Sequence, residues 1–217
     1  MPLSKFRATG YARLAMLLVL LGVIAACAAG VNSSARVQSR ADGFRELPSG
    51  TTVAVLPPTG KGPAARQAIG RAIDSTLQAR GGLEVVGPRE VQSTLNEEGL
   101  VDAYQNALRG YQSTGMMDQE ALGQVFEALG AGYLIQLSAG QFQSEAEAET
   151  NVVTDEVEAM KSKQARVVGR VWAPGRAQPV WTASARASAK ESEFTTIEAD
   201  RARFYFRAAT DLIKKLP

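Results

Sequence analysis

The sequence predicts an α+β fold, a mixed sheet with helices packed on it, in the order β-α-β-α-α-β-β-β-α with an optional further helix between the two central ones. Two observations lead to this prediction. In the first half, short apolar runs alternate with segments in which apolar residues recur every three or four positions. In the second half, long segments have a two-residue periodicity, typical of a long antiparallel meander with one buried face.

The domain is expected to begin at residue 51 with a strand and a helix. Residues 53–56 are apolar and precede two prolines, which indicates a buried strand that ends there. Pro63 suits the first turn of a helix, which Gly81-Gly82 would end. The apolar residues on one face of this helix are Ile69, Ile73 and Leu77. Leu83–Val86 is a second, short strand.

Three helical segments follow before the meander, of which the middle one is the optional helix. Asp118 is a good N-cap for the third, and Gly130 follows it. The predicted inward-facing residues are Val91 and Leu95 in the first segment, Tyr104, Leu108 and Tyr111 in the second, and Leu122, Val125, Phe126 and Leu129 in the third.

The meander consists of three long strands. Tyr133–Ala139 is expected to continue through residues 141–149, and Lys163–Trp172 forms the second strand. A Pro-Gly turn at 174–175 precedes the third strand, Val180–Lys190, whose residues alternate strictly between Trp or Ala and polar side chains. A final helix over residues 195–216 closes the domain. Its predicted inner side contains Phe206, Ala209, Ile213 and Leu216.

Composition excludes several classes of function. The 24 Lys and Arg exceed the 22 Asp and Glu by two, but Lys5, Arg7 and Arg13 precede residue 27, so the rest carries 21 − 22 = −1. A nucleic-acid partner is therefore not expected. The chain has no histidine, which removes Ser-His-Asp triads, Cys-His dyads and His-ligated metal sites, and its single cysteine cannot form an intrachain disulfide. We assign no catalytic residue and no metal site, and expect a protein that is not an enzyme.

The first 26 residues have the pattern of a secretory signal peptide. Residues 1–13 are polar and basic, and residues 14–26 are uncharged and apolar. As a helix, this run would span only about 20 Å, which is short of the roughly 30 Å hydrocarbon core of a bilayer.

The apolar run ends in Ile24-Ala25-Ala26-Cys27, which resembles the bacterial lipobox. The resemblance implies cleavage before Cys27, a diacylglyceryl group on its sulfur and N-acylation of the new terminus by a chain such as palmitate. No other cofactor is expected. Two alternatives are a signal peptide with a chance cysteine and an uncleaved anchor. By the sorting rule of enteric Gram-negative bacteria, Ala28 in place of Asp favours the inner leaflet of the outer membrane, facing the periplasm.

Residues 27–50 are predicted to form the lipidated cysteine and a flexible tether. The segment is rich in Ala, Ser, Arg and Gly, and has no sustained periodicity. About 20 extended residues would reach roughly 70 Å at most. Residues 51–217 are then a single periplasmic domain.

The order of elements resembles a group of lipoprotein domains that includes the curli-export lipoprotein CsgG, the polysaccharide-export lipoprotein PelC and the peptidoglycan-synthase activator LpoB, with the amino-terminal domain of TolB similar in architecture. The matching segments are Val53–Pro57, Leu83–Val86, Leu129–Ile135 and Pro179–Ala183. The tether is shorter than that expected of a synthase activator. Charged residues within 141–166 make this segment costly as a membrane-spanning hairpin.

The resemblance implies a membrane-anchored, non-enzymatic lipoprotein. It would act as an accessory or assembly subunit of an envelope export or surface-assembly machine, in contact with other envelope proteins and with copies of itself in a ring. The alternative is an adaptor or activator that binds a peptidoglycan synthase or another envelope enzyme.

Three further features have two interpretations each. Glu145, Glu147 and Glu149 share one side of a strand and begin an acidic stretch, which is either a solvated strand tip or a cation site or acidic ring in an oligomer. Trp172 and Trp181 flank a turn and either pack in the core or contact a partner or the membrane. The glycines and lysine of residues 59–63 resemble a phosphate loop but lack its spacing, which favours an ordinary turn.

Overall fold

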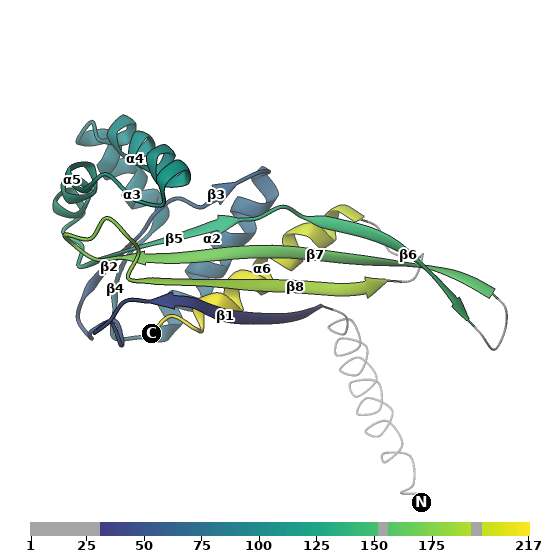
Figure 1. The fold of residues 1–217 in the computed structure, drawn as a ribbon. Helices are drawn as coiled ribbons and strands as arrows, with labels where there is room; N and C mark the ends of the chain where they lie inside the picture. The colour runs from purple at the N-terminus through teal and green to yellow at the C-terminus, as the bar shows by residue number, and fades with distance from the viewer. Residues whose placement is uncertain (1–30, 152–155, 192–196) are drawn as a thin grey trace, which may run out of the picture. The chain divides into compact units, whose positions relative to one another are not determined.

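The sheet is mixed, as the sequence predicts, and has eight strands among the described residues, three more than predicted. The computed structural model describes residues 31–151, 156–191 and 197–217. Its strand order is β1-β8-β7-β5-β2-β4, and β3 pairs with β5 while β6 pairs with β7 (Figure 1). The strands are β1 (Asn32–Arg40), β2 (Thr52–Val55), β3 (Thr59–Gly60), β4 (Glu84–Val86), β5 (Tyr133–Ala139), β6 (Gln143–Asn151), β7 (Glu156–Trp172) and β8 (Trp181–Glu191).

Parallel and antiparallel pairing divide the sheet into two parts. β2 pairs in parallel with β4 and β5, and β3 pairs in parallel with β5. The pairs β5–β7, β6–β7, β7–β8 and β1–β8 are antiparallel, which confirms the predicted meander in the second half. The first predicted strand of the meander is interrupted at residues 140–142, so that β5 and β6 are separate strands that both pair with β7.

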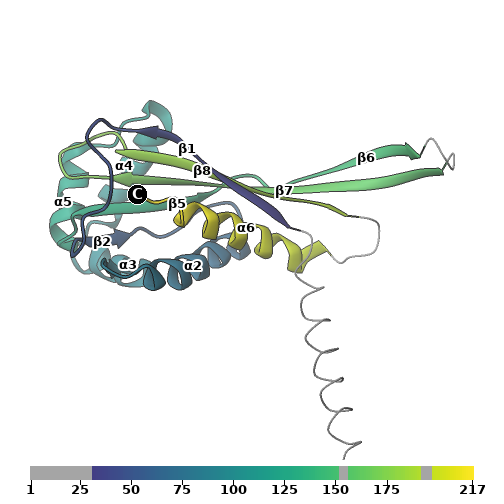
Figure 2. The same cartoon turned by 90° about the horizontal axis from the view of Figure 1, so that it is seen from below.

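Helices cover both faces of the sheet. They are α2 (Pro63–Leu77), with the short 3-10 helix η1 (Gln78–Arg80), α3 (Pro88–Glu97), α4 (Val101–Thr114), α5 (Gln119–Leu129) and α6 (Ile197–Ile213). α2 and α6 lie side by side on one face (Figure 2). α3, α4 and α5 form a hydrophobic cluster against the other face, with Leu134 of β5 and Trp172 of β7. The described chain therefore contains the optional helix, α4.

The strict alternation of β8 determines where α6 packs. Trp181 and every second residue after it as far as Ala189 are buried, whereas Thr182, Ser184 and the other intervening residues are half-buried or exposed. The small alanines let α6 approach closely. At Gly169 of the neighbouring strand β7, a Cβ atom would lie 2.4 Å from Cδ2 of Leu212 in α6. In α6 itself, the predicted inward residue Phe206 is only half-buried, and Phe204 is buried instead.

The predicted tether is wrong over residues 32–47. Residues 32–40 form the edge strand β1, which pairs with β8 from Asn32↔Ser188 to Arg40↔Trp181. Phe44 and Leu47 are buried, with the ring centroid of Phe44 5.6 Å from that of Tyr133. The prediction failed because an edge strand needs a partner on only one side, and most residues of β1 are exposed on both faces, so it has no apolar alternation to detect.

Candidate functional site

One region of the sheet carries no helix and is rich in arginine. This region is formed by β1, β8 and β7, on the face of the sheet against which α3, α4 and α5 pack. The three helices end near Tyr111 of α4 and leave the rest of that face uncovered. Its arginines are Arg36 of β1, Arg166 and Arg170 of β7, and Arg186 of β8. They share one face because Arg36 and Val168 both pair with Ser184, Arg166 pairs with Arg186, and Arg170 pairs with Thr182. We call these four residues the arginine face.

The arginine face lines a shallow hollow of about 540 Å³. Besides three of the arginines, its walls include Gln38 of β1, Tyr111 of α4 and Gln164 of β7. The guanidinium of Arg170 lies over the Tyr111 ring, 5.2 Å from its centroid, and its Nη1 donates to Ser138 Oγ at 3.4 Å. These contacts fix Arg170 at the border between the helical cluster and the open surface, where it is only half-buried.

The other three arginines of this face are exposed. Arg166 and Arg186 are exposed and directly opposite one another on neighbouring strands. In the part of the chain that the structure describes, Arg36, Arg166 and Arg186 form no ion pair. Like charges at directly opposite positions of a sheet are unfavourable. This arrangement suits a surface that receives anionic groups, because guanidinium groups bind carboxylates with two parallel hydrogen bonds.

A second charged feature, of opposite sign, is the hairpin of β6 and the first part of β7. We call residues 143–151 and 156–163 the acidic hairpin; the glutamates of this sequence stretch are Glu145, Glu147, Glu149, Glu156 and Glu158. Glu145 is exposed, and the register places Glu149 opposite Glu158. β8 pairs with β7 only as far as Lys161, so within the described chain the hairpin beyond that residue has two strands.

The cation interpretation of this stretch gains no support from the described residues. Among the residues that the structure describes, no group of three or more His, Cys, Asp or Glu residues is placed to hold a metal ion. In the same residues, no helix is long and apolar enough to cross a membrane.

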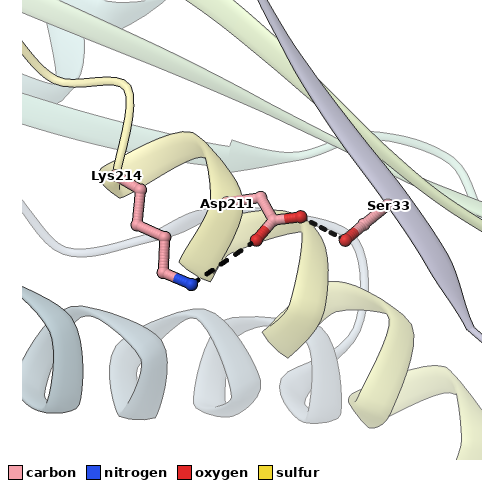
Figure 3. A network of polar contacts seen from close by, with 3 residues as sticks. All are labelled: Ser33, Asp211 and Lys214. Carbon is pink, nitrogen blue, oxygen red and sulfur yellow. Dashed lines mark hydrogen bonds and ion pairs between the residues drawn. The ribbon is translucent and has the colours of Figure 1, made fainter.

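A polar contact fastens β1 to the body of the domain. Ser33 Oγ of β1 donates to Asp211 Oδ2 of α6, and Lys214 Nζ lies 3.9 Å from Asp211 Oδ1 (Figure 3). Asp211 therefore links the first strand of the described chain to its last helix. Cys27 and the predicted lipobox residues Ile24, Ala25 and Ala26 lie outside the described residues, and residues 28–31 stand between Cys27 and β1 in the sequence.

The two tryptophans are core residues, and the predicted contact with a partner or membrane is wrong for both. Trp172 and Trp181 are 0% exposed. They lie on opposite faces of the sheet, because Trp181 pairs with Val171 and consecutive residues of a strand point in opposite directions. Trp172 packs edge-on against Tyr111, with 5.6 Å between ring centroids. The packing interpretation of the sequence is therefore confirmed.

The sequence prediction did not identify the arginine face. The signal was available, because the alternation of β8 places Arg186 on the polar side, and the same alternation applied to β7 groups Arg166 with Arg170. What the sequence lacked was the register that places Arg166 opposite Arg186 and the presence of β1 beside them.

Comparison with known proteins gives matches only among solved structures. No protein-family model and no curated protein matches the chain. PelC from Paraburkholderia phytofirmans, a dodecamer, is 15% identical over 83% of this chain and 98% of its own, with a TM-score of 0.36. Lipoprotein GNA1162 from Neisseria meningitidis is 12% identical over 76% of this chain and 98% of its own, with a TM-score of 0.37.

The carboxy-terminal domain of LpoB from Salmonella enterica is 13% identical, over 70% of this chain and 88% of its own, with a TM-score of 0.37. PelC and LpoB, which the sequence resembles in its order of elements, are thus among the solved structures that the comparison finds. At these identities the likeness concerns the fold alone.

Proposed function

We propose that this protein is a membrane-anchored, non-enzymatic lipoprotein of the bacterial cell envelope that works as an oligomeric accessory or assembly subunit of an export or surface-assembly machine. The observation that carries the proposal is the short distance along the chain between the lipobox cysteine and the first strand. Only residues 28–31 lie between Cys27 and Asn32, so a lipid on Cys27 holds a folded domain, and not the end of a long tether, at the membrane.

The length of this link favours an assembly on the membrane surface. Five residue steps from Cys27 to Asn32 span about 18 Å at most. An adaptor that activates an enzyme beyond the cell-wall layer needs a longer reach, so the short link favours the assembly subunit over the adaptor. Two or more acyl chains give stable attachment, whereas a single chain binds only reversibly. Ala28 supports the outer membrane as the site of anchoring.

The two tyrosines whose pKa values are shifted have structural roles that account for the shift. Burial raises the pKa of Tyr104 above its usual value, and a hydrogen bond from Gln136 Nε2 to Tyr104 Oη, 3.1 Å long, only partly offsets this. Burial also raises the pKa of Tyr205, whose hydroxyl donates to the carbonyl oxygen of Gly140 at 2.7 Å. Both phenols are therefore neutral structural groups that join helices to the sheet, and neither is poised as a base.

Native mass spectrometry of the full-length, lipidated protein in detergent tests the proposed function. We expect a closed oligomer of many subunits, because a subunit of an assembly machine must present the same interface on every copy. A particle that remains strictly monomeric at high protein concentration would contradict the proposal.

A further inference from the structure

The helices on the two faces of the sheet carry opposite net charges. We call α2, η1 and α6 with their flanking residues (61–80 and 197–217) the basic layer; it has nine basic and four acidic residues, 9 − 4 = +5. We call α3, α4 and α5 (residues 88–129) the acidic layer; it has two basic and seven acidic residues, 2 − 7 = −5. The domain therefore has one helical surface that attracts anions and one on the opposite face that repels them.

Arginines of the basic layer lie on its outer surface. In α2, Ile69 and the other buried residues face the sheet, and Arg71 is exposed on the far side of the helix. In α6, Leu212 is among the buried residues, and Arg207 is exposed on the side away from the sheet. Because α2 and α6 lie side by side, these two arginines belong to one surface (Figure 2).

Two hollows lie where α2 and α6 meet, one at each end of the pair. The first, of about 550 Å³, is lined by Lys61, which precedes α2, and by Arg201 of α6. The second, of about 490 Å³, is lined by Arg80 of η1 and by Lys214, whose side chain is 62% exposed although it pairs with Asp211. Each hollow has one cation from the α2 side and one from the α6 side, an arrangement that suits a phosphate group.

The first strand of the described chain is attached to this layer. Ser33 of β1 donates a hydrogen bond to Asp211, close to the end of α6 (Figure 3). Six residue steps separate Ser33 from Cys27, and they span about 21 Å at most. The lipid proposed for Cys27 would therefore hold the end of α6 near the membrane surface.

From these observations we infer that the basic layer lies on a membrane surface that contains anionic phospholipids. This inference rests on the proposed membrane anchoring and specifies which face of the domain meets the bilayer. Headgroup phosphates occupy the two hollows, and Arg71 and Arg207 add to the attraction, since each basic residue close to an anionic leaflet strengthens binding.

Two observations identify a bilayer as the occupant of this surface. The charge of the basic layer is complementary to phosphate groups, and the chain that leads to Cys27 starts beside α6. The acidic layer would be repelled by the same headgroups, which disfavours the reverse orientation. The arginine face lies on the opposite side of the sheet from the basic layer, so it points away from the membrane and is open to other envelope proteins.

Vesicle sedimentation tests this contact without the lipid anchor. Asn32–Pro217 forms a compact unit by itself, so a chain of residues 28–217 contains every described helix and strand. We expect this chain to bind vesicles that contain phosphatidylglycerol and phosphatidylcholine but not vesicles of phosphatidylcholine alone. Raising the salt concentration should release it. Arg71→Glu/Arg207→Glu should lower the partition coefficient on the anionic vesicles by at least about tenfold.

The matched control is Arg89→Glu/Arg109→Glu, which makes the same change in net charge on the acidic layer, where both arginines are exposed. This variant should bind the anionic vesicles as the unaltered chain does. Thermal unfolding checks that each variant is folded. If the reversal in the basic layer is not folded, Arg71→Gln/Arg207→Gln replaces it, with a smaller expected loss of binding.

The inference is overturned if the unaltered chain does not bind anionic vesicles, or if the control loses as much binding as Arg71→Glu/Arg207→Glu. Undiminished binding of that basic-layer variant also overturns it. Loss of binding in Arg166→Glu/Arg186→Glu would then place the membrane contact on the arginine face, and loss of the oligomer in the basic-layer variant would place that layer between copies of the chain. The proposed function is tested separately, because the lipid on Cys27 and the oligomer are measured on the full-length protein.

Discussion

Replacing Trp181 with alanine is expected to lower the free energy of unfolding by about 3–5 kcal/mol. The side chain is 0% exposed and lies at the start of the small-residue stripe of β8. Removing a buried indole leaves a large cavity, and the neighbouring alanines are too small to fill it. Urea unfolding of the domain, followed by fluorescence and circular dichroism, measures the change. We expect the slope of the free energy of unfolding against urea concentration to stay the same.

Two further variants identify packing as the cause. In the described structure, Nε1 of Trp181 has no hydrogen-bond partner, so neither substitution removes a hydrogen bond. Trp181→Phe should therefore cost much less than Trp181→Ala, because the phenyl ring fills most of the cavity. Ser188→Ala, on the exposed side of the same strand, should change stability by less than about 0.5 kcal/mol. If Trp181→Ala left stability unchanged but weakened assembly, the tryptophan would be a contact residue after all.

Replacing Cys27 with alanine is expected to abolish fatty-acid labelling of the protein and to release it from lipid-dependent membrane attachment. The cysteine is the only one in the chain and occupies the acceptor position of the proposed lipobox. Each buried methylene of an acyl chain contributes about 0.8 kcal/mol to the free energy of membrane binding. Loss of all the acyl chains therefore removes the dominant interaction with the membrane. Labelling with a radioactive fatty acid, followed by membrane fractionation, measures both effects.

The matched control is Cys27→Ala/Ser34→Cys, which keeps one cysteine but places it in β1, where Ser34 is exposed. This variant should also be unlabelled, because acylation depends on the lipobox position and not on the presence of a thiol. Labelling that persists in Cys27→Ala would show that the lipid is attached elsewhere and would remove the basis for the anchor.

The sequence predicts best those elements whose residues repeat a clear pattern. The Ala-rich alternation of β8 and the Asp118 cap of α5, whose carboxylate accepts from the Ala121 amide at 3.0 Å, were both recognisable without coordinates. β1 was not, because a strand at the edge of a sheet can be polar on both sides when one neighbour supplies all its hydrogen bonds. Its register with β8 depends on residues nearly 150 positions away.

The same limit applies to the candidate site. Cys27 is predicted from a local motif, and this prediction needs no knowledge of which strands are neighbours. The arginine face depends on which strands are neighbours and on which residues are opposite, and both are properties of the assembled sheet. For Trp172 and Trp181 the sequence allows either core packing or an exposed contact, and the pleat of the sheet decides for packing, with the two side chains on opposite faces.

The central claim is that a lipid on Cys27 holds this domain at the membrane through a link of four residues. Mass spectrometry of the amino-terminal peptide, prepared from full-length protein extracted from membranes, tests it most directly. We expect the mature chain to begin at Cys27 and to carry a diacylglyceryl group on the sulfur and an acyl chain on the amino group. A chain that begins at another residue, or an unmodified Cys27, would contradict the claim.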